Sequence, residues 1–247
     1  MNYNEGDPNY DLFKLSMKVS AKRLFPNYVF LDAPFNLQYY KPGHPETEVA
    51  TMGCRTRVMG NVHDPDRQVT CGRGNLSFTS INLPRIAIEA KGDLKKFYKT
   101  LDDRMELVIR QLLHRFKIQC GKKVYNYPFL MGQGVWIDSD KLGPDDSVAE
   151  VLRHGTLSVG FIGLAETLKA LTGKHHGESP ESQKLGLAII GHMRERMDEE
   201  SRRTGLNFTL LATPAEGLSG RFLRIDQKKY GKIPGVTDRD YYTNSFH

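Results

Sequence analysis

The amino-acid sequence predicts an α/β fold in which strands alternate with long helices. Short apolar runs with alternating faces, at 76–83, 157–162 and 207–211, predict strands. The longer segments between them repeat apolar residues every three or four positions, as amphipathic helices do. Strands joined by such helices need crossover connections, which are typical of parallel sheets. Chemistry in these folds gathers at the carboxyl ends of the strands.

Length and composition are those of an ordinary globular protein. The chain has 247 residues, 39% hydrophobic and 26% charged, with a net charge of +6 that suits anionic ligands such as phosphorylated metabolites. It has no apolar run of membrane-spanning length and no signal-peptide pattern at its start. The three cysteines, 54, 71 and 120, form no CxxC pair, so we expect neither a disulfide framework nor a metal site, and we expect a reducing, cytoplasmic setting.

The first 48 residues are rich in Tyr, Asn, Pro and Asp. A short amphipathic helix is predicted there from Leu12, Leu15, Met17 and Val19, followed by a strand at 28–31 and turns up to Pro45. A further strand at 49–52 leads directly into Gly53 and Cys54.

Helix boundaries are well marked in the rest of the chain. Asp93 is the expected N-cap of a long helix whose apolar residues are Leu94, Phe97, Leu101, Met105, Val108, Leu112 and Phe116. A helix from about 165 is expected to end at Gly173. Another begins with Ser179 as N-cap and Pro180 in its first turn, and ends at Gly205.

Three segments are expected at the carboxyl ends of strands: 53–55, 154–156 with the strand that follows, and 212–217. Cys54 follows a glycine and is flanked by Arg55 and Arg57, two cations that favour a thiolate. From the local sequence alone, a buried structural cysteine is the more frequent alternative.

Polar residues alternate along the strand that follows the Gly72-Arg73-Gly74 loop. Asn75, Ser77 and Thr79 are expected on one face, with Leu76 and Phe78 on the other. The alternative is an ordinary solvent-facing strand.

A small-residue turn, Thr213-Pro214-Ala215-Glu216-Gly217, leads from a strand into a predicted helix. Such a turn exposes backbone N–H groups at the positive end of the helix dipole, which suits phosphate. It lacks the lysine of a P-loop, and similar turns often serve as plain connections. His154 with Thr156 is a further candidate, whereas His175-His176 and the basic helix face at 194–203 are expected to be solvated surface.

Five blocks of sequence, taken together and in order, resemble the anaerobic, glycyl-radical ribonucleotide reductase family. They are Ala50 to Val58, Gly72 to Arg85, His154 to Gly163, Ala212 to Gly217 and Tyr241 to Phe246. The resemblance implies that residues 1–247 form the central part of a catalytic domain, a ten-stranded α/β barrel. It also implies that the nucleotide-sensing N-terminal region and the C-terminal glycyl-radical and zinc region lie outside this chain.

The resemblance assigns roles to individual residues. Cys54 matches the cysteine whose thiyl radical takes the 3′ hydrogen of a ribonucleoside triphosphate, after which the 2′ hydroxyl leaves as water. Asn75 matches the position that hydrogen-bonds the ribose hydroxyls. Thr213, Ala215, Glu216 and Gly217 match the turn that holds the phosphates.

The family further implies a glycyl radical in a segment outside this chain, an activating radical-SAM enzyme, and formate or a dithiol as reductant. It implies ATP and deoxynucleotide effectors, a homodimer in the full-length form, and a structural zinc in the missing C-terminal part, with no membrane or direct nucleic-acid partner. The chain alone is expected to be inactive. The alternatives are a glycyl-radical enzyme of the formate-lyase or dehydratase kind, and a non-catalytic nucleotide-binding domain.

Overall fold

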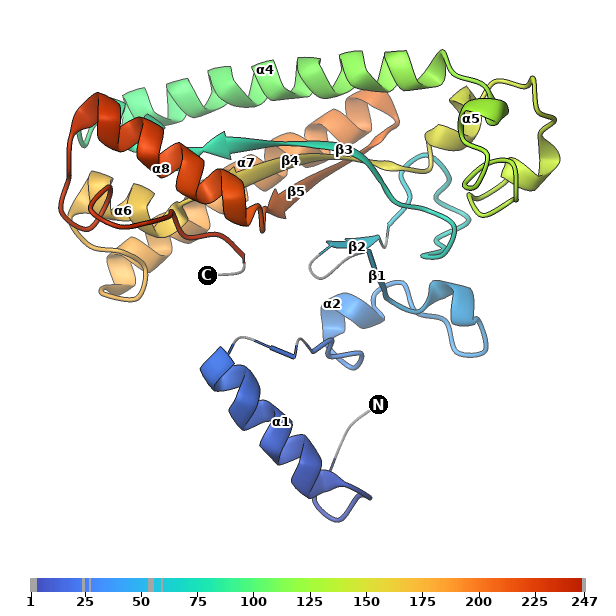
Figure 1. The fold of residues 1–247 in the computed structure, drawn as a ribbon, viewed down its shortest axis with the longest axis horizontal. Helices are drawn as coiled ribbons and strands as arrows, with labels where there is room; N and C mark the ends of the chain where they lie inside the picture. Colours follow the sequence, from blue (N-terminus) through green and yellow to red (C-terminus); the bar gives the residue numbers. More distant parts are fainter. Residues whose placement is uncertain (1–3, 24, 27, 53–55, 59, 246–247) are drawn as a thin grey trace. The chain divides into compact units, whose positions relative to one another are not determined.

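The computed structural model describes residues 4–23, 25–26, 28–52, 56–58 and 60–245. The chain forms two compact units, Met1–Cys71 and Gly72–His247, and each is described here by itself (Figure 1). None of the helices in the described part of the chain is both long and apolar enough to cross a membrane.

The first unit contains short elements. These are the helices α1 (Tyr10–Arg23) and α2 (Pro34–Leu37), a 3-10 turn (Pro45–Thr47), and the strands β1 (Ala50–Met52) and β2 (Thr56–Val58). The two strands pair antiparallel, with Met52 opposite Thr56. The helix predicted from Leu12 to Val19 and the strand predicted at 49–52 are therefore confirmed.

The strand predicted at 28–31 is wrong. The Tyr28 hydroxyl donates to Ser16 Oγ at 2.6 Å, and its ring meets the Phe13 ring edge-on at 6.3 Å. This segment thus packs its aromatic residue against α1, and its described residues are not part of any strand. The four apolar residues from which the helix is predicted stay exposed, Leu12 and Leu15 each by 56%.

The second unit is built on a three-stranded parallel sheet. Its elements, in order, are β3 (Asn75–Asn82), α3 (Leu83–Ala90), α4 (Leu94–Cys120), two 3-10 turns (Val124–Asn126 and Ser139–Lys141), α5 (Ala149–Leu152), β4 (Thr156–Ile162), α6 (Leu164–Thr172), α7 (Pro180–Thr204), β5 (Asn207–Ala212) and α8 (Glu216–Tyr230). The strand order is β3-β4-β5, with both pairs parallel. The predicted α/β architecture with crossover connections is confirmed.

Side-chain caps set the helix boundaries as predicted. Asp93 Oδ1 accepts from the Lys96 N–H at 3.1 Å, and Ser179 Oγ accepts from the Ser182 N–H at 3.1 Å. Gly173 and Gly205 end α6 and α7 with φ values of 81° and 65°, which side chains disfavour. Helix α3 was not anticipated: the Asn82 side chain caps it by accepting from the Arg85 N–H, so β3 ends one residue early.

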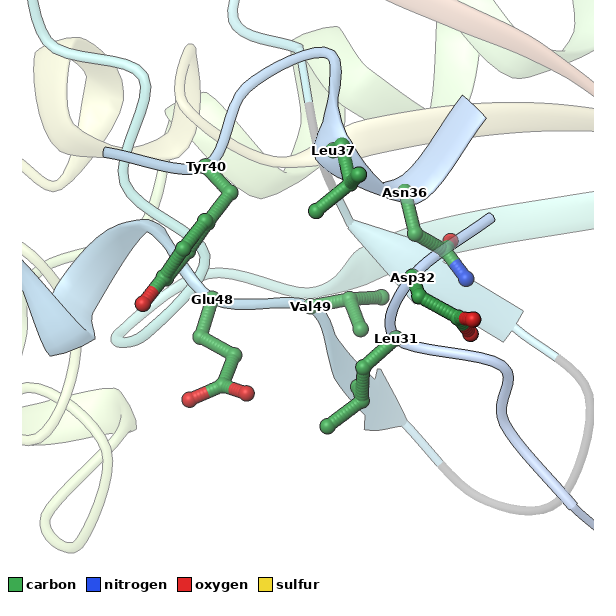
Figure 2. Close-up of a pocket in the computed structure, with 7 residues that line it drawn as sticks. All are labelled: Leu31, Asp32, Asn36, Leu37, Tyr40, Glu48 and Val49. Atoms are coloured by element: carbon green, nitrogen blue, oxygen red, sulfur yellow. The ribbon is translucent and has the colours of Figure 1, made fainter. Parts of the chain in front are cut away.

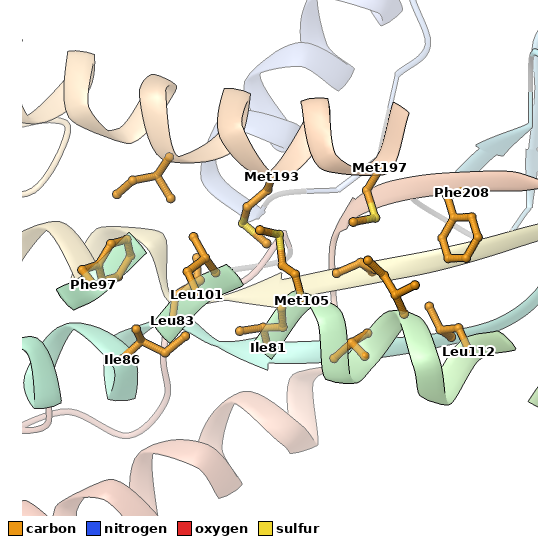
Figure 3. Packing of buried hydrophobic residues seen from close by; sticks show 14 of the residues in the cluster. Ile81, Leu83, Ile86, Phe97, Leu101, Met105, Leu112, Met193, Met197 and Phe208 are labelled. Atoms are coloured by element: carbon orange, nitrogen blue, oxygen red, sulfur yellow. The ribbon is translucent and has the colours of Figure 1, made fainter. Parts of the chain in front are cut away.

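The main core lies between one face of the sheet and the helices α4 and α7 (Figure 3). From α4 come Leu101, Met105 and Leu112, and from α7 Met193 and Met197, all with 0% exposure. The strands contribute Leu157, Val159 and Phe208. Full burial of each large apolar side chain stabilises the fold by about 1.5–3 kcal/mol, so this face of the sheet is held rigidly.

A smaller core fills the lobe between α4 and β4. It contains Val124, Met131, Trp136, Val148 and Val151. The Trp136 indole N–H donates to the Val151 carbonyl at 2.7 Å, which satisfies its buried polar atom. The lobe therefore forms a packed structure of its own at the amino end of the sheet.

A buried carboxylate joins α7 to α4. Glu200 is 1% exposed and accepts from Arg196 and, at 2.6 Å, from Arg203 Nη2, while Arg196 Nη2 also donates to Glu106 of α4 at 2.9 Å. Burial acts to raise the pKa of Glu200, but the hydrogen bonds from Arg203 and Arg196 outweigh it, and the net pKa is lowered. Two arginines of the basic helix face are thus engaged in an ion-pair network.

We predict that Glu200→Gln lowers the free energy of unfolding at pH 7 by about 1–3 kcal/mol, because two arginines lose their charged partner. Since the folded-state pKa is depressed, the stabilisation is present above the unfolded value of 4.5 and lost as the pH falls through the folded value. Urea unfolding of both proteins from pH 7 to pH 3 measures this. A stability gap that stays constant over that range would contradict the assignment.

Candidate functional site

The sheet has a second face, opposite the helix-packed one, and it is polar. Because Leu157 and Val159 of β4 face the core, the alternating residues Thr156, Ser158 and Gly160 face the other way. Ser80 of β3 lies on the same side because it pairs with Gly160. Thr209 of β5 also lies there, because it pairs with Ser158 and their hydroxyl oxygens are 2.8 Å apart. We call Asn75, Ser80, Thr156, Ser158 and Thr209 the polar face.

Asn75 is held at the beginning of β3 by hydroxyl donors from β4. The Ser158 hydroxyl donates to Asn75 Oδ1 at 2.8 Å, and the Thr156 hydroxyl donates to the same oxygen. Ser158 also lies 2.8 Å from Thr209 Oγ1 on β5, so the network crosses all three strands. The amide of Asn75 is therefore fixed with its oxygen toward β4, which turns its N–H₂ group away from that strand.

The grouping of Asn75, Ser77 and Thr79 on one face is wrong. The pairing of β3 with β4 shifts between Asn75 and Ser77, a β-bulge that changes which side chains follow Asn75. Thr79 consequently faces α4, where its hydroxyl donates to Gln111 Oε1 at 2.8 Å. Phe78 lies instead on the side of Asn75, paired with Ser158, and is 49% exposed.

The turn from Thr213 to Gly217 leaves the carboxyl end of β5 and opens α8. Ala215 is the N-cap with φ of 28°, and it offers no side-chain cap. Leu218 and Ser219 donate their N–H groups to the Ala215 carbonyl, whereas the N–H groups of Glu216 and Gly217 have no acceptor among the described residues. Both residues are exposed, and open space surrounds the position where Gly217 would carry a Cβ. This helix N-terminus can accept an anion.

Thr213 itself points inward. It is 1% exposed, its N–H donates to the Phe161 carbonyl at 3.2 Å, and its hydroxyl lies 2.7 Å from Ser80 Oγ. The side chain thus bonds to the polar face and is not presented to solvent.

Asn75 and the turn lie at opposite ends of the sheet. Asn75 pairs with Thr156, and the Thr213 N–H bonds to Phe161, five residues further along β4. At the rise of a parallel strand this is about 17 Å. The segment 154–156 also precedes β4, so the expectation that it sits at a carboxyl end is wrong: it shares the amino end with Asn75.

His154 belongs to a buried cluster at that amino end. It is 5% exposed, its Nε2 lies 3.6 Å from Asp138 Oδ2, and its carbonyl accepts from Arg73 Nε at 2.9 Å. The Thr156 N–H donates to the Gly74 carbonyl at 2.9 Å. The cluster therefore ties the loop before β3 to the loop before β4.

Cys54 lies outside the described residues. It is the middle one of the three residues that connect the paired strands β1 and β2. Of the other cysteines, Cys71 is exposed, and burial raises the pKa of the half-buried Cys120 thiol. Cys120 packs against the smaller core of the second unit, which includes residues of α5 and Trp136.

Two buried carboxylates anchor the segment that follows α8. Asp226, with 0% exposure, accepts from Asn82 Nδ2 at 2.7 Å, Arg85 Nε at 2.6 Å and the Tyr242 hydroxyl at 3.0 Å. Burial, with the Asp226 charge added, raises the pKa of Tyr242. Glu166 accepts from the Thr243 N–H and hydroxyl and from Arg239. The block at 241–245 is thus fixed beside the carboxyl end of the sheet.

The first unit contains a pocket of about 190 Å³. Figure 2 shows the carboxylate of Glu48 near the Tyr40 ring on one side and that of Asp32 beside Asn36 on the other. Two carboxylates repel phosphate, so this pocket does not suit a triphosphate. The described residues contain no group of three or more His, Cys, Asp or Glu side chains placed to hold a metal ion.

The parallel strands and the helical crossovers between them define an α/β protein, and the N-terminus of α8 lies at the carboxyl end of its sheet. The family model described as anaerobic ribonucleoside-triphosphate reductase matches residues 1–247. The chain therefore belongs to the anaerobic ribonucleoside-triphosphate reductase family.

Individual relatives agree with this assignment. The anaerobic ribonucleoside-triphosphate reductase of Escherichia coli K12 is 38% identical over 250 residues, which cover 100% of this chain and 34% of that protein. The protein of the same name from enterobacteria phage T4 is 32% identical, with 39% of its length covered. The chain thus spans somewhat more than a third of the curated relatives that it matches.

Solved structures agree on the fold. The anaerobic ribonucleotide reductase from Thermotoga maritima, with glycerol in the active site, superimposes with a TM-score of 0.52 at 20% identity, covering 71% of this chain and 27% of that one. The same protein in complex with dATP and CTP gives the same values. The α/β fold of the chain is similar to part of that reductase.

We predict that Asp226→Asn lowers the free energy of unfolding by about 3 kcal/mol, because an amide cannot accept from all three donors and Arg85 loses its counter-charge. The matched control is Asp103→Asn, which removes an exposed pair with Lys99 and is expected to cost at most about 0.5 kcal/mol. Chemical unfolding of both variants measures the difference. Equal effects would show that the Asp226 network is not a structural anchor.

Proposed function

We propose that this chain supplies the substrate-binding sheet and the radical-carrying cysteine of an enzyme that reduces ribonucleoside triphosphates to deoxyribonucleoside triphosphates. The match of the family model over the whole chain carries the proposal. The polar face and the open N-terminus of α8 support it, because together they offer hydrogen-bonding groups for a sugar and N–H donors for phosphates.

Cys54 is the proposed reactive residue. A glycyl radical in a segment outside this chain would take the hydrogen atom of the Cys54 S–H group, which would leave the unpaired electron on sulfur. The Cys54 sulfur then takes the hydrogen atom from C3′ of the ribose, the 2′ hydroxyl leaves as water with one added proton, and formate or a dithiol supplies the two electrons that complete the reduction. Cys54 finally returns its hydrogen atom to C3′. Sulfur suits this cycle because an S–H bond is weak enough for the exchange to run in both directions, while the protein holds the reacting atoms in place.

Asn75 is proposed to contact the ribose hydroxyls. Its Oδ1 accepts from Ser158 and Thr156, which fixes the orientation of the side chain, and its amide N–H₂ is a donor of the kind that a hydroxyl oxygen accepts from. A donor of this kind stabilises a hydroxyl oxygen that gathers negative charge as the 2′ C–O bond breaks.

The turn at 213–217 is proposed to hold the phosphates through backbone groups. Glu216 and Gly217 offer exposed N–H groups at the positive end of α8, and Ala215 sets their direction. The Glu216 carboxylate would repel phosphate, so its expected contribution comes from the main chain. The anaerobic ribonucleotide reductase from Thermotoga maritima, whose fold is similar, binds dATP and CTP in its solved complex, which supports nucleotide ligands here.

We further propose that the sheet is part of a ten-stranded barrel. Among the described strands, β3 pairs on one side only. A pocket of about 380 Å³ is lined by the end of β3, including Ile81, together with Leu107 and Val108 of α4 and Phe222 of α8. Helix α8 returns from β5 to β3, where Asp226 bonds Asn82, so a strand that follows α8 can pair with β3.

Membership of the family adds further components to the proposed enzyme. They are an activating radical-SAM enzyme, ATP and deoxynucleotide effectors, a homodimeric full-length form, and a structural zinc in a segment outside this chain. The reaction requires a reducing setting, as the cytoplasm provides.

We predict that Cys54→Ser abolishes deoxyribonucleotide formation, because an O–H bond is too strong to exchange hydrogen with a sugar carbon. The test uses a polypeptide of the relatives' full length that contains this chain, activated anaerobically, with product measured by chromatography. Binding of the ribonucleoside triphosphate is expected to be retained. Turnover by the serine variant would refute the role of Cys54.

We predict that Asn75→Ala in the same polypeptide lowers kcat roughly 10- to 100-fold, the loss expected for one hydrogen bond that strengthens in the transition state. Substrate KM should change less, because phosphate binding lies elsewhere. Steady-state kinetics with a saturating reductant measures both constants. An unchanged kcat would remove Asn75 from the reaction.

A further inference from the structure

The polar face contains a hydrogen bond that crosses an entire strand. Ser80 on β3 and Thr213 at the end of β5 are not neighbours in the sheet, because β4 lies between their strands. Their hydroxyl oxygens are nevertheless 2.7 Å apart. Neighbouring strands are about 4.8 Å apart, so two short side chains can meet above a middle strand only where that strand carries no side chain.

Gly160 provides this space. It pairs with Ser80 on one side and with Leu211 on the other. A Cβ added to Gly160 would overlap Thr213 Oγ1 and lie 2.7 Å from Ser80 Oγ. The glycine at this position is therefore required by the Ser80–Thr213 hydrogen bond, which we call the hydroxyl bridge.

The hydroxyl bridge fixes the residue from which the anion-binding turn starts. The main chain of Thr213 is also held on both sides, by the Phe161 carbonyl at 3.2 Å and by the Ser245 N–H at 3.4 Å. From Thr213 to the first residue of α8 the chain passes through Pro214, whose ring fixes φ, and Ala215, whose φ of 28° is disfavoured for a side-chain residue. A strained residue persists where its surroundings hold it.

Resting on the proposed function, we propose that Ser80, Gly160 and Thr213 are positioning residues for the triphosphate. The hydroxyl bridge sets the place and direction of the Glu216 and Gly217 N–H groups. It acts through the turn and does not itself touch the ligand, since Thr213 is 1% exposed and its hydroxyl is engaged by Ser80. The alternative is that the hydroxyl bridge only stabilises the sheet and has no effect on ligand binding.

The test uses Thr213→Val, which keeps the shape and removes the hydroxyl, and Ser80→Ala, which removes the other partner. Both are made in the full-length polypeptide that contains this chain. We expect each to raise the KM for the ribonucleoside triphosphate and the inhibition constant of inorganic tripolyphosphate by roughly 3- to 10-fold, the effect of one hydrogen bond. The double variant should show no further increase, because both changes remove the same bond. Thr213→Ser, which restores the hydroxyl, should recover both constants.

Thr79→Val is the matched control. It removes a hydroxyl hydrogen bond of 2.8 Å from the other face of the same strand, so it should alter stability without changing either constant. If Thr213→Val and Ser80→Ala lower the unfolding midpoint but leave KM and the tripolyphosphate constant unchanged, the positioning role is refuted. If the unaltered enzyme turns over but tripolyphosphate does not compete with substrate, the phosphate assignment of the turn fails and the proposal with it. A lack of turnover in the unaltered enzyme would instead reject the proposed reaction.

Discussion

The structure of the second unit depends on the apolar contact between one face of the parallel sheet and the helices α4 and α7. Leu157 and Val159 of β4 meet Leu101, Met105 and Met193 with essentially no exposure. Side chains alternate along a strand, so this contact also determines which residues form the other face of the sheet. Every residue between the core positions points away from the helices. The polar residues at those positions, in particular Thr156 and Ser158, therefore lie together on the other face.

The hydroxyl and amide groups of the polar face hydrogen-bond to one another. These bonds fix the orientations of the side chains at its two ends. Hydroxyls of β4 hold the oxygen of Asn75, and a hydroxyl bond over Gly160 holds Thr213. Asn75 and Thr213, near the two ends of the sheet, are thus held by side-chain hydrogen bonds between strands, and the apolar core packs against the opposite face. Asn75 and the turn stand about 17 Å apart along the strands, so an extended ligand, with its sugar toward one end and its phosphates toward the other, suits the face better than a compact one.

Much of this architecture could be predicted from the sequence because its signals are local. Capping residues such as Asp93 and Ser179, and glycines such as Gly205, act within one helical turn, and each marked its boundary correctly. The bulge after Asn75 could not be predicted, because it arises from the pairing of β3 with β4, and it reversed the expected face of Thr79. The buried anchors Glu166 and Asp226 were missed for the same reason: their partners lie far away in sequence. A period-two pattern in Thr156, Ser158 and Gly160 was the available signal for the polar face.

We propose that a ribonucleoside triphosphate lies along the polar face, with its phosphates at the N-terminus of α8. The most direct measurement is a crystal structure of the full-length polypeptide that contains this chain, with the ribonucleoside triphosphate bound. The account predicts phosphate oxygens within hydrogen-bonding distance of the Glu216 and Gly217 N–H groups, and a ribose hydroxyl at the Asn75 amide nitrogen. Phosphates bound elsewhere, with the α8 N-terminus facing solvent, would contradict it.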